Sequence, residues 1–171
     1  MKYCFFILFL SLLAACGTST TTSTENNAFA DCQYGSPKAI FSNEIPLVSA
    51  HTFELRANTA VETVVFDADI QLELTQSGCE KPKQVFQFTI PGDSTGYTPE
   101  DWIEMALNQF KFLGSLHEPL QALHFWGNAL SEQKETIKLG QPVPLEQGRF
   151  VKIDKVADSQ KGILMIELYQ E

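Results

Sequence analysis

A sustained alternation of apolar and polar residues, from Val64 to Thr75, constrains the fold of this chain more than any other feature. The even-numbered positions are apolar from Val64 to Leu74, and the odd-numbered positions after Val65 are polar. Alternation of this length is typical of an antiparallel strand with one face on a core and the other in water. We therefore expect one long strand here, with the even-numbered side chains buried.

Two β-hairpins are predicted from the pattern around this strand. Turn-forming residues at 76–82 separate it from a second alternating segment, Gln84 to Ile90. This predicts a long hairpin over about 63–91, with Cys79 in its loop. Near the C-terminus, an alternating segment and an apolar segment flank a turn at 158–162, which predicts a second hairpin over about 149–170.

A helix is predicted between the two hairpins, over about 99–113. Thr98 is a good N-cap residue, and Pro99 suits the first helical position. Apolar residues then follow at helical spacing, and we expect Gly114 to end the helix.

A second helix is predicted over about 119–134. Gly127 lies inside it and costs about 1 kcal/mol relative to alanine, which predicts close packing against a neighbouring element. Strands, then two helices, then strands favour an α+β fold, in which both helices cover one face of an antiparallel sheet.

The N-terminus carries a separate pattern. Lys2 precedes an apolar run, Phe5 to Leu13, that is too short to cross a bilayer, which takes about 20 apolar residues. A short apolar core behind a positive start indicates a signal peptide. The residues Leu13-Ala14-Ala15-Cys16 resemble the lipobox of bacterial lipoprotein precursors. The resemblance implies that residues 1–15 are removed and that lipid on Cys16 binds the membrane; cleavage by the ordinary signal peptidase is the alternative.

The residues after the lipobox predict a tether and then one domain. Residues 16–30 are rich in Thr and Ser and have no apolar period, which predicts a flexible tether with a reach on the order of 20 Å. A single globular domain is expected over 31–171. Gly17 follows Cys16 where lipoproteins kept in the inner membrane usually have Asp. The resemblance therefore implies an outer-membrane anchor facing the periplasm, or the outer leaflet of the plasma membrane if the source has one membrane.

The charge of the chain narrows the classes of partner. The 12 basic and 21 acidic residues become 11 and 21 when Lys2 is removed, so the mature charge is −10. Non-specific nucleic-acid binding depends on Lys and Arg, so we expect no nucleic-acid partner. An acidic surface suits a basic envelope protein instead.

The cysteines are consistent with export. Cys4 leaves with the signal peptide and Cys16 carries the lipid, which leaves Cys32 and Cys79 in an oxidising compartment. We predict that these two form a disulfide, the alternative being two unpaired thiols.

Candidate catalytic and metal-binding residues are few. Asp67, Asp69 and Glu73 lie on the polar face of the predicted strand, which is either a solvated face or a weak calcium site. His117 and His124 do not have metal-ligand spacing. The sequence contains no nucleophile elbow, phosphate-binding loop or dinucleotide fingerprint, so we predict no cofactor and no metal.

The predicted helices are aromatic, with Trp102 and Trp126 among their apolar positions. These residues either fill the core or form an exposed groove for a partner. We list Asp67, Asp69, Glu73, Trp102 and Trp126 as a candidate partner surface. The hypothesis is a non-enzymatic binding or accessory lipoprotein, such as an inhibitor or immunity protein for a cationic partner. The alternative is an envelope hydrolase with a carboxylate or histidine site.

Overall fold

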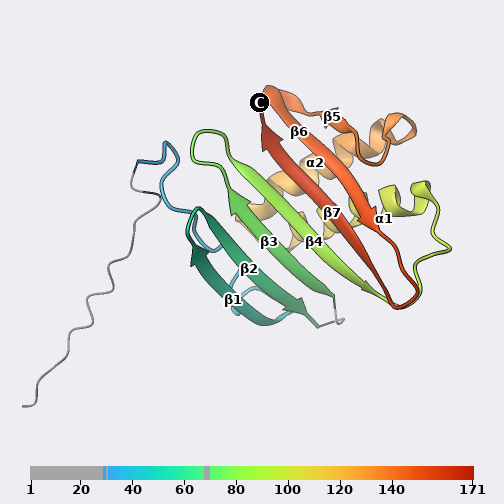
Figure 1. Ribbon diagram of the computed structural model, residues 1–171, viewed down its shortest axis with the longest axis horizontal. Coiled ribbons are helices and arrows are strands. Elements are labelled where there is room, and N and C mark those ends of the chain that lie inside the picture. Colours follow the sequence, from blue (N-terminus) through green and yellow to red (C-terminus); the bar gives the residue numbers. More distant parts are fainter. Residues whose placement is uncertain (1–28, 30, 68–69) are drawn as a thin grey trace, which may run out of the picture.

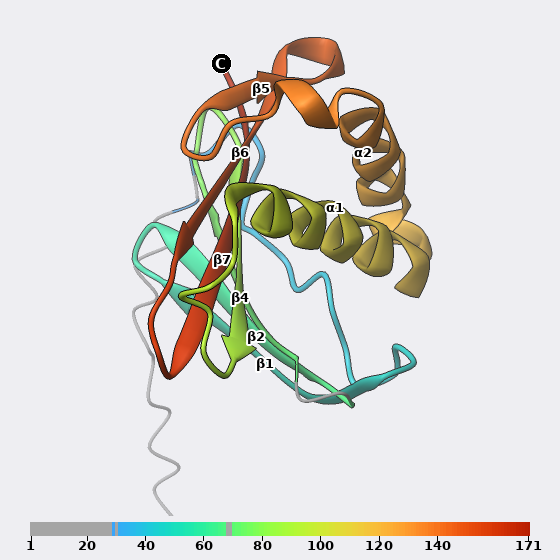
Figure 2. The same ribbon diagram turned by 90° about the vertical axis from the view of Figure 1, so that its right-hand side faces the viewer.

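The computed structural model describes residues 29, 31–67 and 70–171. Strands form one antiparallel sheet in the order β1-β2-β3-β4-β7-β6-β5, and helices α1 and α2 pack on one of its faces (Figures 1 and 2). The α+β prediction is confirmed. The strands are β1 Val48–Arg56, β2 Thr59–Phe66, β3 Gln71–Ser77, β4 Lys83–Pro91, β5 Pro142–Pro144, β6 Arg149–Val156 and β7 Lys161–Gln170. The helices are α1 Pro99–Leu116 and α2 Gln121–Glu132, with short 3₁₀ helices η1 Glu118–Leu120, η2 Lys134–Thr136 and η3 Glu146–Gly148.

The expected single strand from Val64 to Thr75 is instead two strands. β2 ends at Phe66, the chain turns, and β3 pairs antiparallel with β2, so that Val64 lies opposite Leu72. The backbone N–H of Phe66 donates to the carbonyl of Ile70 at 2.9 Å and closes the turn. Paired residues share a face, and Val64 and Leu72 both have even numbers. The alternation therefore continues through the reversal without a break.

Both predicted hairpins are present. β3 and β4 form a hairpin in which Leu72 lies opposite Phe88, and β6 and β7 form the C-terminal hairpin. β7 lies between β4 and β6, and Phe88 lies opposite Leu164. The side chains of Leu72, Phe88 and Leu164 are fully buried on the face that the helices cover, so the core extends across the centre of the sheet.

Helix α1 begins as predicted and ends later than predicted. Asp101 N–H donates to Thr98 Oγ1 at 3.2 Å, and Thr98 N–H donates back to Asp101 Oδ2 at 2.8 Å, which makes a capping box. Gly114 does not end α1, because the helix continues to Leu116. Gly114 instead lies where α2 crosses, and a methyl group there would collide with the backbone of His124.

Gly127 confirms the predicted close approach. A Cβ atom at Gly127 would lie 3.1 Å from Cγ of Lys111 and 3.3 Å from Cβ of Phe110, both on α1. Each helix therefore contributes one glycine to the crossing. No helix in the described part of the chain has the length and apolar character needed to cross a membrane.

The segment before β1 covers the rest of the inner face. Phe41 and Ile45 are buried in the same cluster as the sheet and helix residues, and the ring of Phe41 meets that of Phe66 edge-on at 6.2 Å. In Figure 2 this segment runs on the helix side of the sheet. Loop residues thus cover the part of the sheet that the two helices do not reach.

The predicted disulfide between Cys32 and Cys79 is confirmed. It joins the segment before β1 to the β3–β4 loop, across a sequence separation of 47. The lipobox, Leu13 to Cys16, lies outside the described residues, as does the tether apart from Phe29.

Candidate functional site

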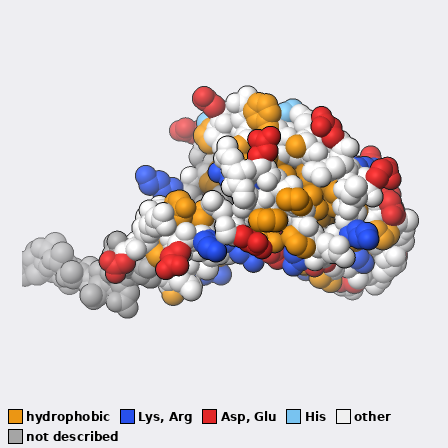
Figure 3. All heavy atoms as spheres, turned by 90° about the horizontal axis from the view of Figure 1, so that it is seen from above, with side chains coloured by type: hydrophobic (Ala, Val, Ile, Leu, Met, Phe, Trp, Pro, Cys, Tyr) orange, Lys and Arg blue, Asp and Glu red, His pale blue; other side chains and the backbone are white. Residues whose placement is uncertain are grey.

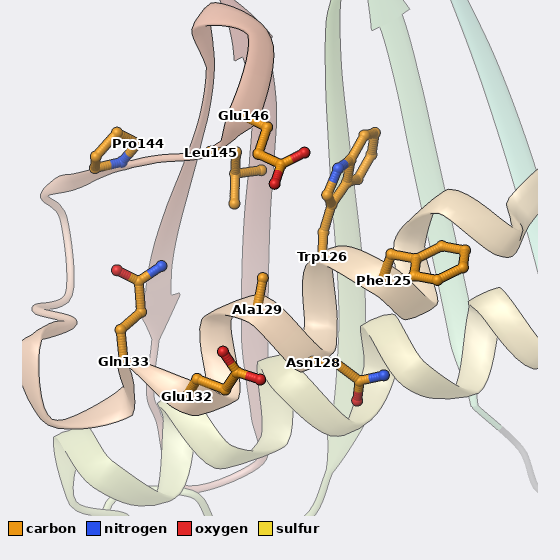
Figure 4. Close-up of a pocket in the computed structure, with 9 residues that line it drawn as sticks. All are labelled: Phe125, Trp126, Asn128, Ala129, Glu132, Gln133, Pro144, Leu145 and Glu146. Carbon is orange, nitrogen blue, oxygen red and sulfur yellow. The ribbon is translucent and has the colours of Figure 1, made fainter.

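The first part of the candidate site is an open hollow of about 620 Å³ between α2 and the connection from β5 to β6 (Figure 4). One side is formed by α2 and the other by residues that follow β5. Figure 4 shows Trp126 beside Leu145 and Glu146, with the Glu146 carboxylate turned toward the indole. The lining residues are Phe125, Trp126, Asn128, Ala129, Glu132, Gln133, Pro144, Leu145 and Glu146.

A second hollow of about 310 Å³ adjoins the first, and Trp126 lines both. It lies where the β3–β4 loop, the end of β7 and the N-terminal segment meet. Its lining residues are Tyr34, Pro82, Gln84, Trp126, Arg149, Leu168, Tyr169 and Gln170. We call the two hollows together the Trp126 groove.

The helical spacing of α2 explains why Trp126 faces this groove. Leu123, Gly127 and Leu130 are buried, and α2 packs mainly against α1. Positions 126, 129 and 133 follow each other at helical spacing on the adjacent flank, so Trp126, Ala129 and Gln133 line one wall.

A tight turn forms the opposite wall of the first hollow. Gln147 and Gly148 both have positive φ, 62° and 70°, and the backbone N–H of Leu145 donates to the carbonyl of Arg149 at 2.7 Å. This turn directs Leu145 and Glu146 toward α2. Arg149 leaves the turn with its guanidinium 5.1 Å from the Trp126 ring centroid, which is a cation–π contact.

The first hollow is acidic. Glu132 and Glu146 line it, and neither carboxylate has an ion-pair partner among the residues that the structure describes. Arg149, the nearby cation, is stacked on Trp126. Figure 3, seen from above the view of Figure 1, shows a patch of hydrophobic side chains with both acidic and basic side chains around it. The groove can therefore bind a ligand that is apolar in part and positively charged in part.

The structure separates the other residues of the predicted partner surface. Trp102 is fully buried, so this prediction is corrected: Trp102 is a core residue of α1. Asp67 lies exposed in the turn after β2, while Glu73 lies on β3, and Asp69 is outside the described residues. Since the predicted strand is two strands, Asp67 and Glu73 do not lie on one strand. Among the members of the predicted set that the structure describes, only Trp126 lines the groove.

The histidines do not form a metal site. His117 follows α1 and His124 lies in α2, where Nδ1 is 3.5 Å from the carbonyl of Lys111. Over 31–67 and 70–171, no group of His, Cys, Asp and Glu side chains is arranged to hold a metal ion. The described part of the chain therefore gives the hydrolase alternative no metal centre.

Sequence reasoning missed one buried polar pair. Nε2 of His51 lies 2.7 Å from a carboxylate oxygen of Glu62, which is fully buried. A signal was present, because Glu62 occupies an even position in the segment where Ala60, Val64 and Phe66 are buried. A charged residue at an inward position predicts a buried partner.

The groove residues Glu132, Glu146 and Arg149 were also missed. They lie on α2, η3 and β6, which come together only in the folded chain, so local sequence patterns contain no signal for them. Comparisons with models of protein families, with curated proteins and with solved structures find no match.

Proposed function

We propose that this chain is the precursor of an outer-membrane lipoprotein whose domain faces the periplasm and acts as a non-enzymatic binding module. The anchor is supported by Lys2, the apolar run and the lipobox ending at Cys16. The binding role rests on one observation, the Trp126 groove with its exposed aromatic wall.

The groove has the properties of a recognition surface. Its larger hollow, at about 620 Å³, lies within the range of about 300–1,000 Å³ that is typical of ligand sites. Phe125 beside it is 65% exposed, and large apolar side chains gathered on a surface mark interaction sites. Tryptophan and arginine, which stack here, are the residues most enriched among those that dominate binding energy.

The position of the groove relative to the anchor also supports a role close to the membrane. Tyr34 lines the second hollow and lies close in sequence to Cys32, which the disulfide holds to the domain. We expect the tether after Cys16 to have a reach on the order of 20 Å. A lipid on Cys16 therefore keeps the groove near the membrane surface, where it can meet other envelope proteins.

The anchor is tested by metabolic labelling with a palmitate analogue, followed by fractionation of the envelope. We expect label on the wild-type protein, in the outer-membrane fraction, and none on a Cys16→Ser variant. A Cys4→Ser variant is the matched control and should keep the label. Label on the Cys16→Ser protein would contradict the proposed anchor.

The binding module is tested by photocrosslinking in live cells. A photoreactive amino acid at Ala129, which is exposed in the groove, is compared with one at Thr63, which is exposed on β2. We expect a discrete protein adduct from position 129 that disappears when Trp126 is changed to Ala, and none from position 63. Equal adducts from both positions, or none from position 129, would refute a binding role for the groove.

A further inference from the structure

We propose that the Trp126 groove binds an extended segment of a protein partner in which a Lys or Arg side chain is followed closely by an apolar side chain. This inference rests on the function proposed above and specifies its ligand. The basic side chain occupies the hollow between α2 and the β5–β6 connection. The apolar side chain occupies the second hollow, on the other side of Trp126.

Charge assigns the basic side chain to the first hollow. Glu132 and Glu146 line its two walls, one on α2 and one on η3, and the described residues supply no ion-pair partner for either. A cation placed between them is attracted by both carboxylates. Hydrogen bonds to ionised groups are about twice as strong as those between neutral groups. Leu145 and Trp126 line the apolar side of this position.

The second hollow has a different character. Pro82, Leu168 and the rings of Tyr34 and Tyr169 line it, so it suits an apolar side chain. Gln84, Gln170 and the Arg149 guanidinium lie at the same hollow and can bond to the backbone of a bound segment. Because the two hollows meet at Trp126, an extended chain can fill both.

The net charge of the chain indicates which kind of ligand the groove binds. The net charge is −9, so a second copy of the chain or an anionic headgroup would be repelled from two unpaired carboxylates. A basic protein segment is attracted both by the groove and by the whole domain, which raises the association rate at low salt. We therefore assign the groove to a basic partner segment.

The test uses the full mature lipoprotein in a non-ionic detergent and two blocked peptides without tryptophan. One has the sequence Gly-Lys-Gly-Leu-Gly-Lys-Gly-Leu, and the other has Glu in place of each Lys. Trp102 is fully buried, so a change in tryptophan emission on titration reports on Trp126. We expect the Lys peptide to bind and the Glu peptide not to bind.

Charge-neutralising variants identify the site. Glu132→Gln with Glu146→Gln should weaken binding of the Lys peptide by about tenfold, and should flatten its dependence on salt. The matched control, Glu44→Gln with Glu73→Gln, removes the same charge at exposed positions that do not line the groove. It should change the affinity by less than about twofold, because long-range charge is screened.

Three results would overturn the inference: equal binding of the two peptides, no binding of either, or equal weakening by the control pair. These results are distinct from failure of the binding function itself. If the Lys peptide does not bind but position 129 still crosslinks to a partner, the groove is a binding site for a different chemistry. If position 129 forms no adduct in cells, the proposed function fails whether or not the peptide binds.

Discussion

The carboxylate of Glu62 on β2 lies 2.7 Å from Nε2 of His51 on β1, at a position with no exposure to solvent. The same carboxylate accepts the backbone N–H of Ile40 at 3.0 Å and that of Phe41 at 2.7 Å. Burying a charge is unfavourable unless it is paired and hydrogen-bonded, and here several donors converge on it. Glu62 therefore fastens the segment before β1 to the sheet, which makes it a structural residue.

The first prediction concerns the hydrogen bonds and the ion pair of Glu62. Glu62→Gln replaces one carboxylate oxygen with an NH₂ group, which cannot accept a hydrogen bond from a backbone N–H. The change also removes the negative charge of the carboxylate to which His51 and the two backbone N–H groups bond. We expect a loss of about 2 kcal/mol in the free energy of unfolding, measured by urea denaturation of the oxidised protein. Glu54→Gln on β1 is the control, since the Glu54 side chain is 65% exposed and should contribute less than about 0.5 kcal/mol. A stability equal to wild type for Glu62→Gln would refute this role.

The second prediction concerns the disulfide. Replacing Cys32 and Cys79 together by Ser should lower the free energy of unfolding by about 4 kcal/mol, because a cross-link with a sequence separation of 47 restricts the unfolded chain. Thermal unfolding with and without reductant gives the measurement. The wild type should fall to the level of the double variant when reduced, whereas the double variant should not respond. A reductant effect that persists in the double variant would contradict the prediction.

The third prediction concerns the helix crossing. Gly114→Ala places a methyl group against the backbone of His124, and helix backbones cannot move apart without loss of core contacts. We expect a destabilisation of about 1–3 kcal/mol, the range found for overpacked cores. Gly96→Ala is the matched control, since a Cβ there meets no atom within 4 Å. That variant should be neutral or more stable by up to about 1 kcal/mol, through a less flexible unfolded chain.

The fourth prediction concerns acid stability. Burial raises the pKa of Glu167, but the hydrogen bond from Lys83 and the charges of Lys83 and Lys152 lower it by more, so the net pKa lies below its usual value. A depressed pKa contributes stability at neutral pH that is lost as the pH falls through the folded-state value. We therefore expect Glu167→Gln to cost about 0.5–1 kcal/mol at pH 7 and nothing at pH 2.

The measurement is the free energy of unfolding from pH 7 to pH 2. The wild type and Glu167→Gln curves should converge only below about pH 4.5, where unfolded glutamate becomes protonated. Glu80→Gln, an exposed loop position, should track the wild type throughout. A constant gap between the Glu167→Gln and wild-type curves across the whole range would show that the lost stability comes from packing.

Local sequence patterns were sufficient to predict most of the helices and strands. The capping pattern at Thr98 located the start of α1, and alternation located β4 and β6. The reversal after Phe66 was missed because the paired residues share parity, so a hairpin and a straight strand have the same pattern. Gly114 was misinterpreted for a related reason: a glycine can end a helix or permit a close crossing, and only the position of α2 distinguishes the two.

The candidate site was much less predictable. Trp126 was selected as an aromatic residue on a helix, and so was Trp102, yet Trp102 is fully buried. The difference arises from tertiary packing, because α1 lies across the centre of the sheet while the flank of α2 borders the β5–β6 connection. The turn at Gln147 and Gly148, which directs Glu146 to the groove, depends on positive φ angles that a sequence does not specify.

The Cys32–Cys79 bond has a mechanical consequence. A pulling force applied to the chain on the N-terminal side of Cys32 passes through the sulfur atoms to Cys79 in the β3–β4 loop, and it bypasses the intervening residues, which include β1, β2 and β3. Those three strands, which include the edge strand β1, would then bear no tension. If the domain is held between a lipid and a partner, the load falls first on β4, which lies between β3 and β7 in the sheet and is harder to peel away than an edge strand.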